Sequence, residues 1–194
     1  MSDNLTVYIH ADESCLGNQF KERANPGGAA GLVEIFRDGQ WFRRDYWISE
    51  PDTTNNRMAI RSASEALAAL TRPCRVVFVS DSQYLVKGMR EWIYGWKKKG
   101  WKRKAGPIEN LELWQALDRE AARHMVDWRW VRGHAGHPRN EYANDLAVDA
   151  ARGGTASGGF VESGFEAWLE NHREKGRYQD FQEFLPPDQL DLGK

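Results

Sequence analysis

The hydrophobic and polar positions of this chain predict five β-strands. Strand-like patterns cover residues 5–12, 28–36, 41–48, 75–80 and 126–130. The first three follow one another without a helix between them, which favours an antiparallel meander. The fourth is continuously apolar from Val76 to Val79. Such a run is typical of a strand that is buried on both faces in a parallel sheet.

Apolar residues at helical spacing predict helices between the later strands. Ile60 and Leu67 share one helix face, and Pro73 ends that helix before the fourth strand. Similar patterns predict helices over residues 111–121 and 140–151. A strand–helix–strand crossover favours parallel pairing. We therefore expect an α/β fold with a five-stranded mixed sheet, in which three antiparallel strands precede parallel crossovers and helices flank the sheet.

Two carboxylates stand where predicted strands end. Asp12 follows the first strand and Asp81 follows the fourth. Open α/β sheets bind ligands at the carboxyl ends of their strands. If these two strands are neighbours, Asp12 and Asp81 lie at one sheet edge and form a hard-oxygen site suited to Mg²⁺ or Mn²⁺. A helix-capping Asp without chemistry is the ordinary alternative for either residue.

Residues 92–104 have the most unusual composition in the chain. They combine three tryptophans with six basic residues and contain no acidic residue. Gly95 and Gly100 interrupt the segment, which suits a protruding basic platform better than a core helix. Lys and Arg side chains contact phosphates, and aromatic rings stack on bases. The segment therefore predicts nucleic-acid binding, with a solvated helix face as the alternative.

Composition and charge fit one domain with an appendage. The 194 residues are 41% hydrophobic, which is enough for one core. Residues 1–152 carry a net charge of +3, and residues 153–194 carry −4. Cys15 and Cys74 lack the spacing of metal ligands, and no apolar run reaches membrane-spanning length. We therefore expect a cytoplasmic protein that is a monomer.

The sequence divides into a domain over residues 1–152, a Gly-rich linker over residues 153–159 and a C-terminal extension over residues 160–194. Phe165 begins a short amphipathic helix in the extension. That helix either packs on its own domain or binds a partner. The division predicts that a chain ending at Ala151 folds and binds its substrate.

Five sequence motifs occur in the order found in bacterial type-1 ribonuclease H and closely resemble it. They lie at residues 12–18, 53–58, 81–84, 92–104 and 133–138. The resemblance covers about residues 5–152. It implies a ribonuclease-H-like fold and endonucleolytic hydrolysis of the RNA strand of RNA–DNA hybrids. It also implies two divalent metal ions, Mg²⁺ or Mn²⁺.

The resemblance further implies roles for individual residues. Asp12, Asp81 and Asn144 match positions of metal ligands, and His134 matches a residue that shuttles protons during product release. Thr54 and Asn110 match residues that bind a DNA phosphate. The residues implied to contact nucleic acid are Cys15, Asn18, Thr54, Asn55, Asn56, Gln83, Trp92, Lys97, Lys98, Lys99, Trp101, Lys102 and Asn110.

The chain departs from the family at two of its four carboxylates. Ala59 stands where the family has Glu, and Asn144 stands where it has Asp. Asn144 offers a metal an oxygen without a charge. Glu13 is the preferred replacement, because the backbone can leave the pleat at a strand end. Asp145 is the other candidate ligand, but it is rotated by about 100° from Asn144 on a helix.

The sequence therefore predicts a metal-dependent ribonuclease H that is weak for its family. The alternative is a module of the same fold that binds hybrids or duplexes and has lost catalysis. The platform residues are equally compatible with both hypotheses, so only the metal site separates them.

Overall fold

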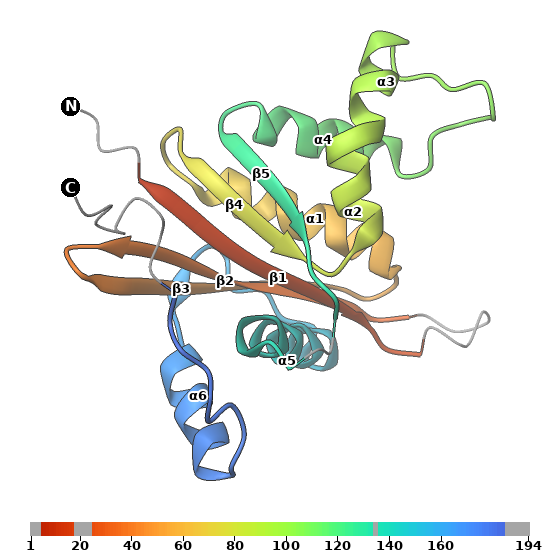
Figure 1. Cartoon of the computed structure of the whole chain (residues 1–194). Helices are drawn as coiled ribbons and strands as arrows, with labels where there is room; N and C mark the ends of the chain where they lie inside the picture. The colour runs from red at the N-terminus through yellow and green to blue at the C-terminus, as the bar shows by residue number, and fades with distance from the viewer. Residues whose placement is uncertain (1–4, 18–24, 134–135, 185–194) are drawn as a thin grey trace, which may run out of the picture.

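A computed structural model describes residues 5–17, 25–133 and 136–184 of the chain. Helices cover both faces of a mixed six-stranded sheet (Figure 1). The strands are β1 (Thr6–Cys15), β2 (Gly27–Arg37), β3 (Gln40–Glu50), β4 (Arg75–Ser80), β5 (Met125–Trp130) and β6 (Val161–Glu162). Their order across the sheet is β5-β4-β1-β2-β3-β6. β1, β2 and β3 form the expected antiparallel meander, and β4 and β5 continue the sheet in parallel with β1.

The helices occupy the expected connections. They are α1 (Asn55–Ala69), α2 (Gln83–Lys87), the π-helical turn η1 (Gly88–Trp92), α3 (Ile93–Lys98), α4 (Leu111–Ala121), α5 (Pro138–Gly153) and α6 (Phe165–Glu174). In Figure 1, α1 and α4 lie on one face of the sheet and α5 lies on the other. α2, η1 and α3 rise together away from the sheet and form the protrusion that the basic segment predicted. No helix in the described part of the chain is long and apolar enough to cross a membrane.

Strand alternation divides the core between the two faces. Val7 and Ile9 of β1 join Leu67 of α1 and Trp114 of α4 in the main hydrophobic cluster. The intervening residue Tyr8 belongs to a different cluster, since neighbouring side chains on a strand point to opposite faces. By the same alternation along β1, the Asp12 side chain points to the same face of the sheet as Tyr8, and the Glu13 side chain points to the same face as Ile9.

The mixed sheet is confirmed, but it has six strands and not five. The additional strand is β6, whose two residues pair with Arg44 and Asp45 at the edge of β3. Two residues are too few to produce a recognisable hydrophobic period, so the sequence pattern did not reveal this strand.

The residues after α5 stay in contact with the sheet. The backbone nitrogen of Ser157 donates to the carbonyl of Trp47 on β3 at 2.9 Å. In α6, Phe165 is fully buried and Leu169 is nearly so, against Leu32 of β2 and Tyr142 of α5. The amphipathic helix of the extension is therefore packed on its own domain.

Candidate active site

Three carboxylates meet where β1 and β4 run side by side. β1 and β4 pair in parallel, with Ala11 opposite Ser80, so Asp12 and Asp81 come next at one edge. Oxygen atoms of Asp12, Glu13 and Asp81 all lie within 4.8 Å of one another. The parallel pairing of two separately predicted strands therefore brings these side chains together.

Glu13 enters this group from β1 itself. The strand runs to Cys15 and does not end at residue 12, so Glu13 is an ordinary strand residue. Its backbone nitrogen donates to Asp12 Oδ1 at 2.7 Å. On the α1 face, Ala59 is 1% exposed and brings no ligand atom. The structure thus places a strand carboxylate at the acidic group, while the helix position holds a methyl group.

Asp145, the other candidate ligand, makes a contact away from the acidic group in this structure. Asp145 Oδ2 accepts a hydrogen bond from the indole Nε1 of Trp168 at 2.9 Å. The side chain is thus engaged with α6, and Asp145 is absent from the acidic group among the described residues. Trp168 lies in the amphipathic helix predicted for the extension, but the sequence left open what that helix contacts. Asn144 is half-buried on the adjacent position of α5.

Asn140 is a site residue that the sequence analysis missed. It is 4% exposed, and its amide Nδ2 donates to Asp12 Oδ2 at 3.2 Å. Asn140 lies four residues before Asn144, so both share one face of α5. That spacing was the signal available in the sequence. The close packing of α5 also depends on Gly28, where an added Cβ would lie 2.1 Å from the carbonyl oxygen of Ala147.

The acidic group favours a cation. Burial, followed by the charge of Asp81, raises the pKa of Asp12 to about 8. Burial and then the charges of Asp12 and Asp81 raise the pKa of Glu13 well above its ordinary value. Both shifts mean that negative charge is poorly stabilised here. A divalent ion with a preference for oxygen ligands fits the donor set and supplies the missing positive charge.

These pKa shifts predict how pH affects stability without metal. The folded protein holds the Asp12 proton up to about pH 8, whereas the carboxyl's ordinary pKa is 3.8. Between these values the folded state binds more protons than the unfolded state, so the free energy of unfolding falls as pH rises. We expect the melting temperature in chelator to decline across this window. Mn²⁺ should raise it most at the alkaline end, since bound carboxylates must be deprotonated.

Differential scanning fluorimetry in chelator and in Mn²⁺ checks this expectation. Asp12→Asn is the matched variant, because it removes one of the two carboxyls with a raised pKa and should make the decline shallower. A wild-type melting temperature that rises steadily from pH 4 to pH 8 in chelator would contradict it.

The pair predicted to bind a phosphate lies together on the α1 side. Thr54 caps α1, since its hydroxyl accepts from the backbone nitrogen of Arg57 at 3.3 Å. Asn110 has a left-handed backbone, with φ of 56°, and its Oδ1 accepts from Arg57 Nη1 at 3.3 Å. Arg57 thus joins the two residues and adds a positive charge that the sequence analysis did not assign.

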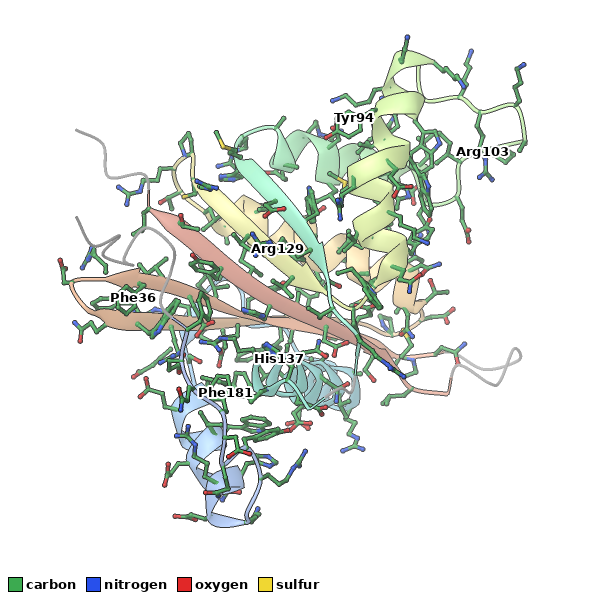
Figure 2. All side chains as sticks on the ribbon, viewed as in Figure 1. Phe36, Tyr94, Arg103, Arg129, His137 and Phe181 are labelled. Atoms are coloured by element: carbon green, nitrogen blue, oxygen red, sulfur yellow. The ribbon has the colours of Figure 1, made fainter. Side chains whose placement is uncertain are left out.

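The tryptophans of the basic segment pack in the interior of the protrusion. Trp92 contacts Trp96, and Trp96 contacts the fully buried Trp114, with ring centroids 5.9 and 5.7 Å apart. Trp101 is likewise packed against the main core cluster. The rings are therefore partly used for packing and are not all free to stack on bases. Figure 2 shows Tyr94 and Arg103 on this protrusion, away from the sheet.

The lysines of the protrusion are exposed. Lys98, Lys99 and Lys102 face solvent, whereas Lys97 Nζ pairs with Asp118 Oδ1 at 2.9 Å. Lys99 and Lys102 line a cleft of about 430 Å³ beside Trp92.

The remaining predicted contacts divide into two sets. Asn55 and Gln83 are exposed, Asn56 is half-exposed, and Cys15 is partly buried near the acidic group. Asn18 and His134 lie outside the described residues. Gly133, which precedes His134 in the sequence, lies close to the acidic group, since an added Cβ there would lie 2.2 Å from Asp81 Oδ2.

Comparison with known proteins agrees with this architecture. The RNase H family model matches residues 4–152. Ribonuclease H of Pseudomonas paraeruginosa is 46% identical over 149 residues, which cover 76% of this chain and 94% of that protein. A protein named ribonuclease HI from Pseudomonas aeruginosa has the same identity and coverage.

Solved structures are also similar to this chain in their tertiary structure. The crystal structure of LC9-RNase H1, "a type 1 RNase H with the type 2 active-site motif", is 48% identical, with a TM-score of 0.83. The match covers 98% of this chain and 97% of that one. The solution structure of the PFV RNase H domain is 18% identical, with a TM-score of 0.65 over 77% of this chain and 94% of that one, and supports the fold alone. From its sequence and its architecture, the chain belongs to the ribonuclease H family.

Proposed function

We infer that this ribonuclease H hydrolyses the RNA strand of RNA–DNA hybrids endonucleolytically, with Mg²⁺ or Mn²⁺. The observation that carries this inference is the group of three carboxylates within 4.8 Å at the edge of β1 and β4. The alternative, a binding module without catalysis, is not favoured, because the loss of Glu at position 59 is matched by Glu13 in the same group.

We assign the metal ligands to Asp12, Glu13 and Asp81, with Asn144 as an uncharged oxygen donor. A divalent ion bound there lowers the pKa of coordinated water and offsets charge on the scissile phosphate, and the family uses two such ions. Asn140 orients Asp12 through its hydrogen bond. His134 is assigned to proton transfer during product release, because a histidine titrates near neutral pH.

One similar protein has an active-site motif that differs from that of its own type. LC9-RNase H1 is described as a type 1 enzyme that carries the type 2 active-site motif, at 48% identity to this chain. A type 1 RNase H with the active-site motif of another type is therefore known from a protein that is similar over nearly the whole length. We propose that this chain is likewise a natural variant with its own ligand set.

The deciding experiment is cleavage of an end-labelled RNA–DNA hybrid in Mg²⁺, Mn²⁺ or chelator. We expect internal cuts in the RNA strand with either metal and none in chelator, while duplex DNA of the same sequence stays intact. A protein that binds the hybrid but remains silent in both metals at high enzyme concentration would support the binding-module alternative.

We propose that the protrusion grips the DNA strand through its exposed lysines. Thr54, Asn110 and Arg57 form the candidate phosphate site, and Cys15, Asn55, Asn56 and Gln83 are proposed as further contacts with the hybrid. The tryptophans mainly hold the protrusion in shape, because they contact one another and Trp114.

Replacing Lys98, Lys99 and Lys102 with Ala is expected to weaken hybrid binding. Each lost phosphate contact should also reduce the slope of log affinity against log salt by roughly one. A salt series of binding isotherms measures both quantities. Lys175→Ala on α6 removes a lysine far from the protrusion and serves as the control. An unchanged affinity and slope in the triple variant would remove the protrusion from the interface.

We further propose that residues 1–152 form the catalytic domain, that residues 153–159 connect it and that residues 160–194 are an extension completing it. Contacts of Phe165 and Ser157 with the sheet support a structural role for the extension. A monomeric state and a cytoplasmic location are proposed on the sequence grounds given above.

A further inference from the structure

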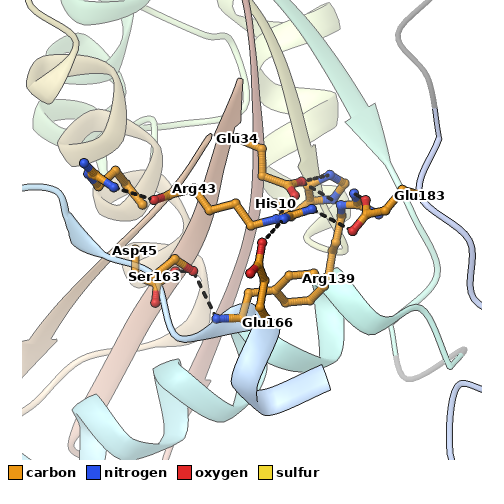
Figure 3. A network of polar contacts seen from close by, with 10 residues as sticks. His10, Glu34, Arg43, Asp45, Arg139, Ser163, Glu166 and Glu183 are labelled. Carbon is orange, nitrogen blue, oxygen red and sulfur yellow. Dashed lines mark hydrogen bonds and ion pairs between the residues drawn. The ribbon is translucent and has the colours of Figure 1, made fainter. Parts of the chain in front are cut away.

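The last described residues of the extension reach an ion-pair network that is buried at its centre and open at its rim, where the Glu183 side chain is 38% exposed (Figure 3). Its centre is Glu34 of β2, which is fully buried and accepts from Arg43 Nε at 2.9 Å and from Arg139 Nε at 2.6 Å. Glu183 pairs with both arginines, at 2.6 Å to Arg43 Nη2 and by a short contact to Arg139 Nη2. Two arginines that lie far apart in the sequence thus share two carboxylates.

Aromatic contacts hold residues 181–184 in place. The ring of Phe184 lies 5.1 Å from Tyr8 of β1 and 5.1 Å from Trp41 of β3, centroid to centroid. The guanidinium of Arg139 lies over the rings of Phe181 and Phe184, at 5.2 and 5.1 Å. Glu183 therefore stands between two anchored aromatic residues and is held against Arg139.

Arg139 is next to the residue that contacts the acidic group. Asn140 donates to Asp12, and both Arg139 and Asn140 are almost fully buried in the first turn of α5. One side of this turn is held by Glu34 and Glu183, and the other side touches a metal ligand. A displacement of Arg139 would move Asn140 with it, because the two share a helical backbone.

We propose that Glu183 is a positioning residue for the metal site, acting through Arg139 on the first turn of α5. Because Asn140 and Asn144 are amides, they bring no charge that would draw α5 toward a bound cation. The position of their helix then depends on its other contacts, among them the ion pairs that Arg139 makes with Glu34 and Glu183. The proposal rests on the proposed metal-dependent cleavage.

The network offers a matched pair of variants. Glu183 and Glu166 both place a carboxylate from the extension on Arg43, but only Glu183 also reaches Arg139. Glu166 is 78% exposed and pairs with Arg43 Nη1 at 2.7 Å. A comparison of Glu183→Ala and Glu183→Gln with Glu166→Ala therefore distinguishes two effects. One is the loss of the contact with α5, and the other is the general loss of a charge in the extension.

Mn²⁺ binding without nucleic acid, measured by calorimetry on the full chain, is the first readout. We expect Glu183→Ala to weaken it by about 10-fold, the size of effect that residues supporting metal ligands usually have. Glu183→Gln should recover part of the loss, because its amide oxygen still accepts from Arg139, and Glu166→Ala should match the wild type. In hybrid cleavage, Glu183→Ala should lower kcat and leave KM nearly unchanged.

These measurements distinguish a failure of the positioning role from a failure of the proposed function. If Glu183→Ala lowers the melting temperature while Mn²⁺ affinity and kcat stay at wild-type values, the residue is merely structural and the proposal fails. If Glu166→Ala weakens Mn²⁺ binding as much as Glu183→Ala, the specific route through Arg139 fails. A wild-type protein that binds Mn²⁺ but cleaves no hybrid contradicts the proposed function, and the calorimetric comparison still tests the positioning role.

Discussion

Glu13→Gln is expected to lower the rate of hybrid cleavage by about 100-fold or more while making the metal-free protein more stable. Loss of residues that only support metal ligands costs about 10–100-fold, and Glu13 is assigned as a ligand itself. Stability should rise because the substitution removes one of three crowded carboxylates that burial and mutual repulsion disfavour. Opposite changes in activity and stability are typical of a functional residue.

Single-turnover cleavage and thermal melting in chelator measure the two effects. Glu65→Gln is the control, because it neutralises an exposed glutamate on α1 and should alter neither quantity. A second variant, Glu13→Gln with Ala59→Glu, moves the carboxylate to the position where the family has it. Partial recovery of cleavage is expected there, limited by the strain of placing Glu at a site that is 1% exposed. Full activity in Glu13→Gln, together with a gain from Ala59→Glu alone, would show that Glu13 is no ligand.

Phe165→Ala is expected to destabilise the protein by about 3–5 kcal/mol, the usual cost of removing a fully buried phenylalanine. Phe165 is 0% exposed and packs against Leu32 and Tyr142, so the substitution leaves a cavity between α6 and the sheet. Urea unfolding measures the change. Tyr94→Ala is the aromatic control, because Tyr94 is 67% exposed and its loss should alter stability by less than about 0.5 kcal/mol.

A chain ending at Ala151 lacks the contacts that the extension makes with the sheet. Truncation there removes Phe165, the β6 pairing and Glu183, and it leaves Asp45 without the hydrogen bonds from Ser163 and Gly164. We now expect poor folding, in contrast to the prediction from sequence. Soluble truncated protein with wild-type melting and cleavage would contradict a structural role for the extension.

The sequence was sufficient for five of the six strands and for two of the three carboxylates in the acidic group. Continuous apolar runs and helical spacing follow from local burial, so β4 and α1 were predicted near their true positions. Asp12 and Asp81 were brought together by one further rule, the parallel pairing of strands joined by a helix. The sequence favoured Glu13 over Asp145 as a third acid, but no periodicity along the chain places either side chain at the sheet edge.

The sequence by itself therefore determined the five longer strands, the main helices, the basic protrusion and the edge at which the carboxylates gather, since all of these depend on local pattern and chain connectivity. Only the tertiary structure decided which acids belong to the group. β1 continues through Glu13, and Trp168 holds Asp145 against α6. The link from Glu183 to Arg139 likewise joins residues 44 positions apart and is defined by burial and charge pairing. Such contacts form only after the chain has folded, so no pattern along the chain records them.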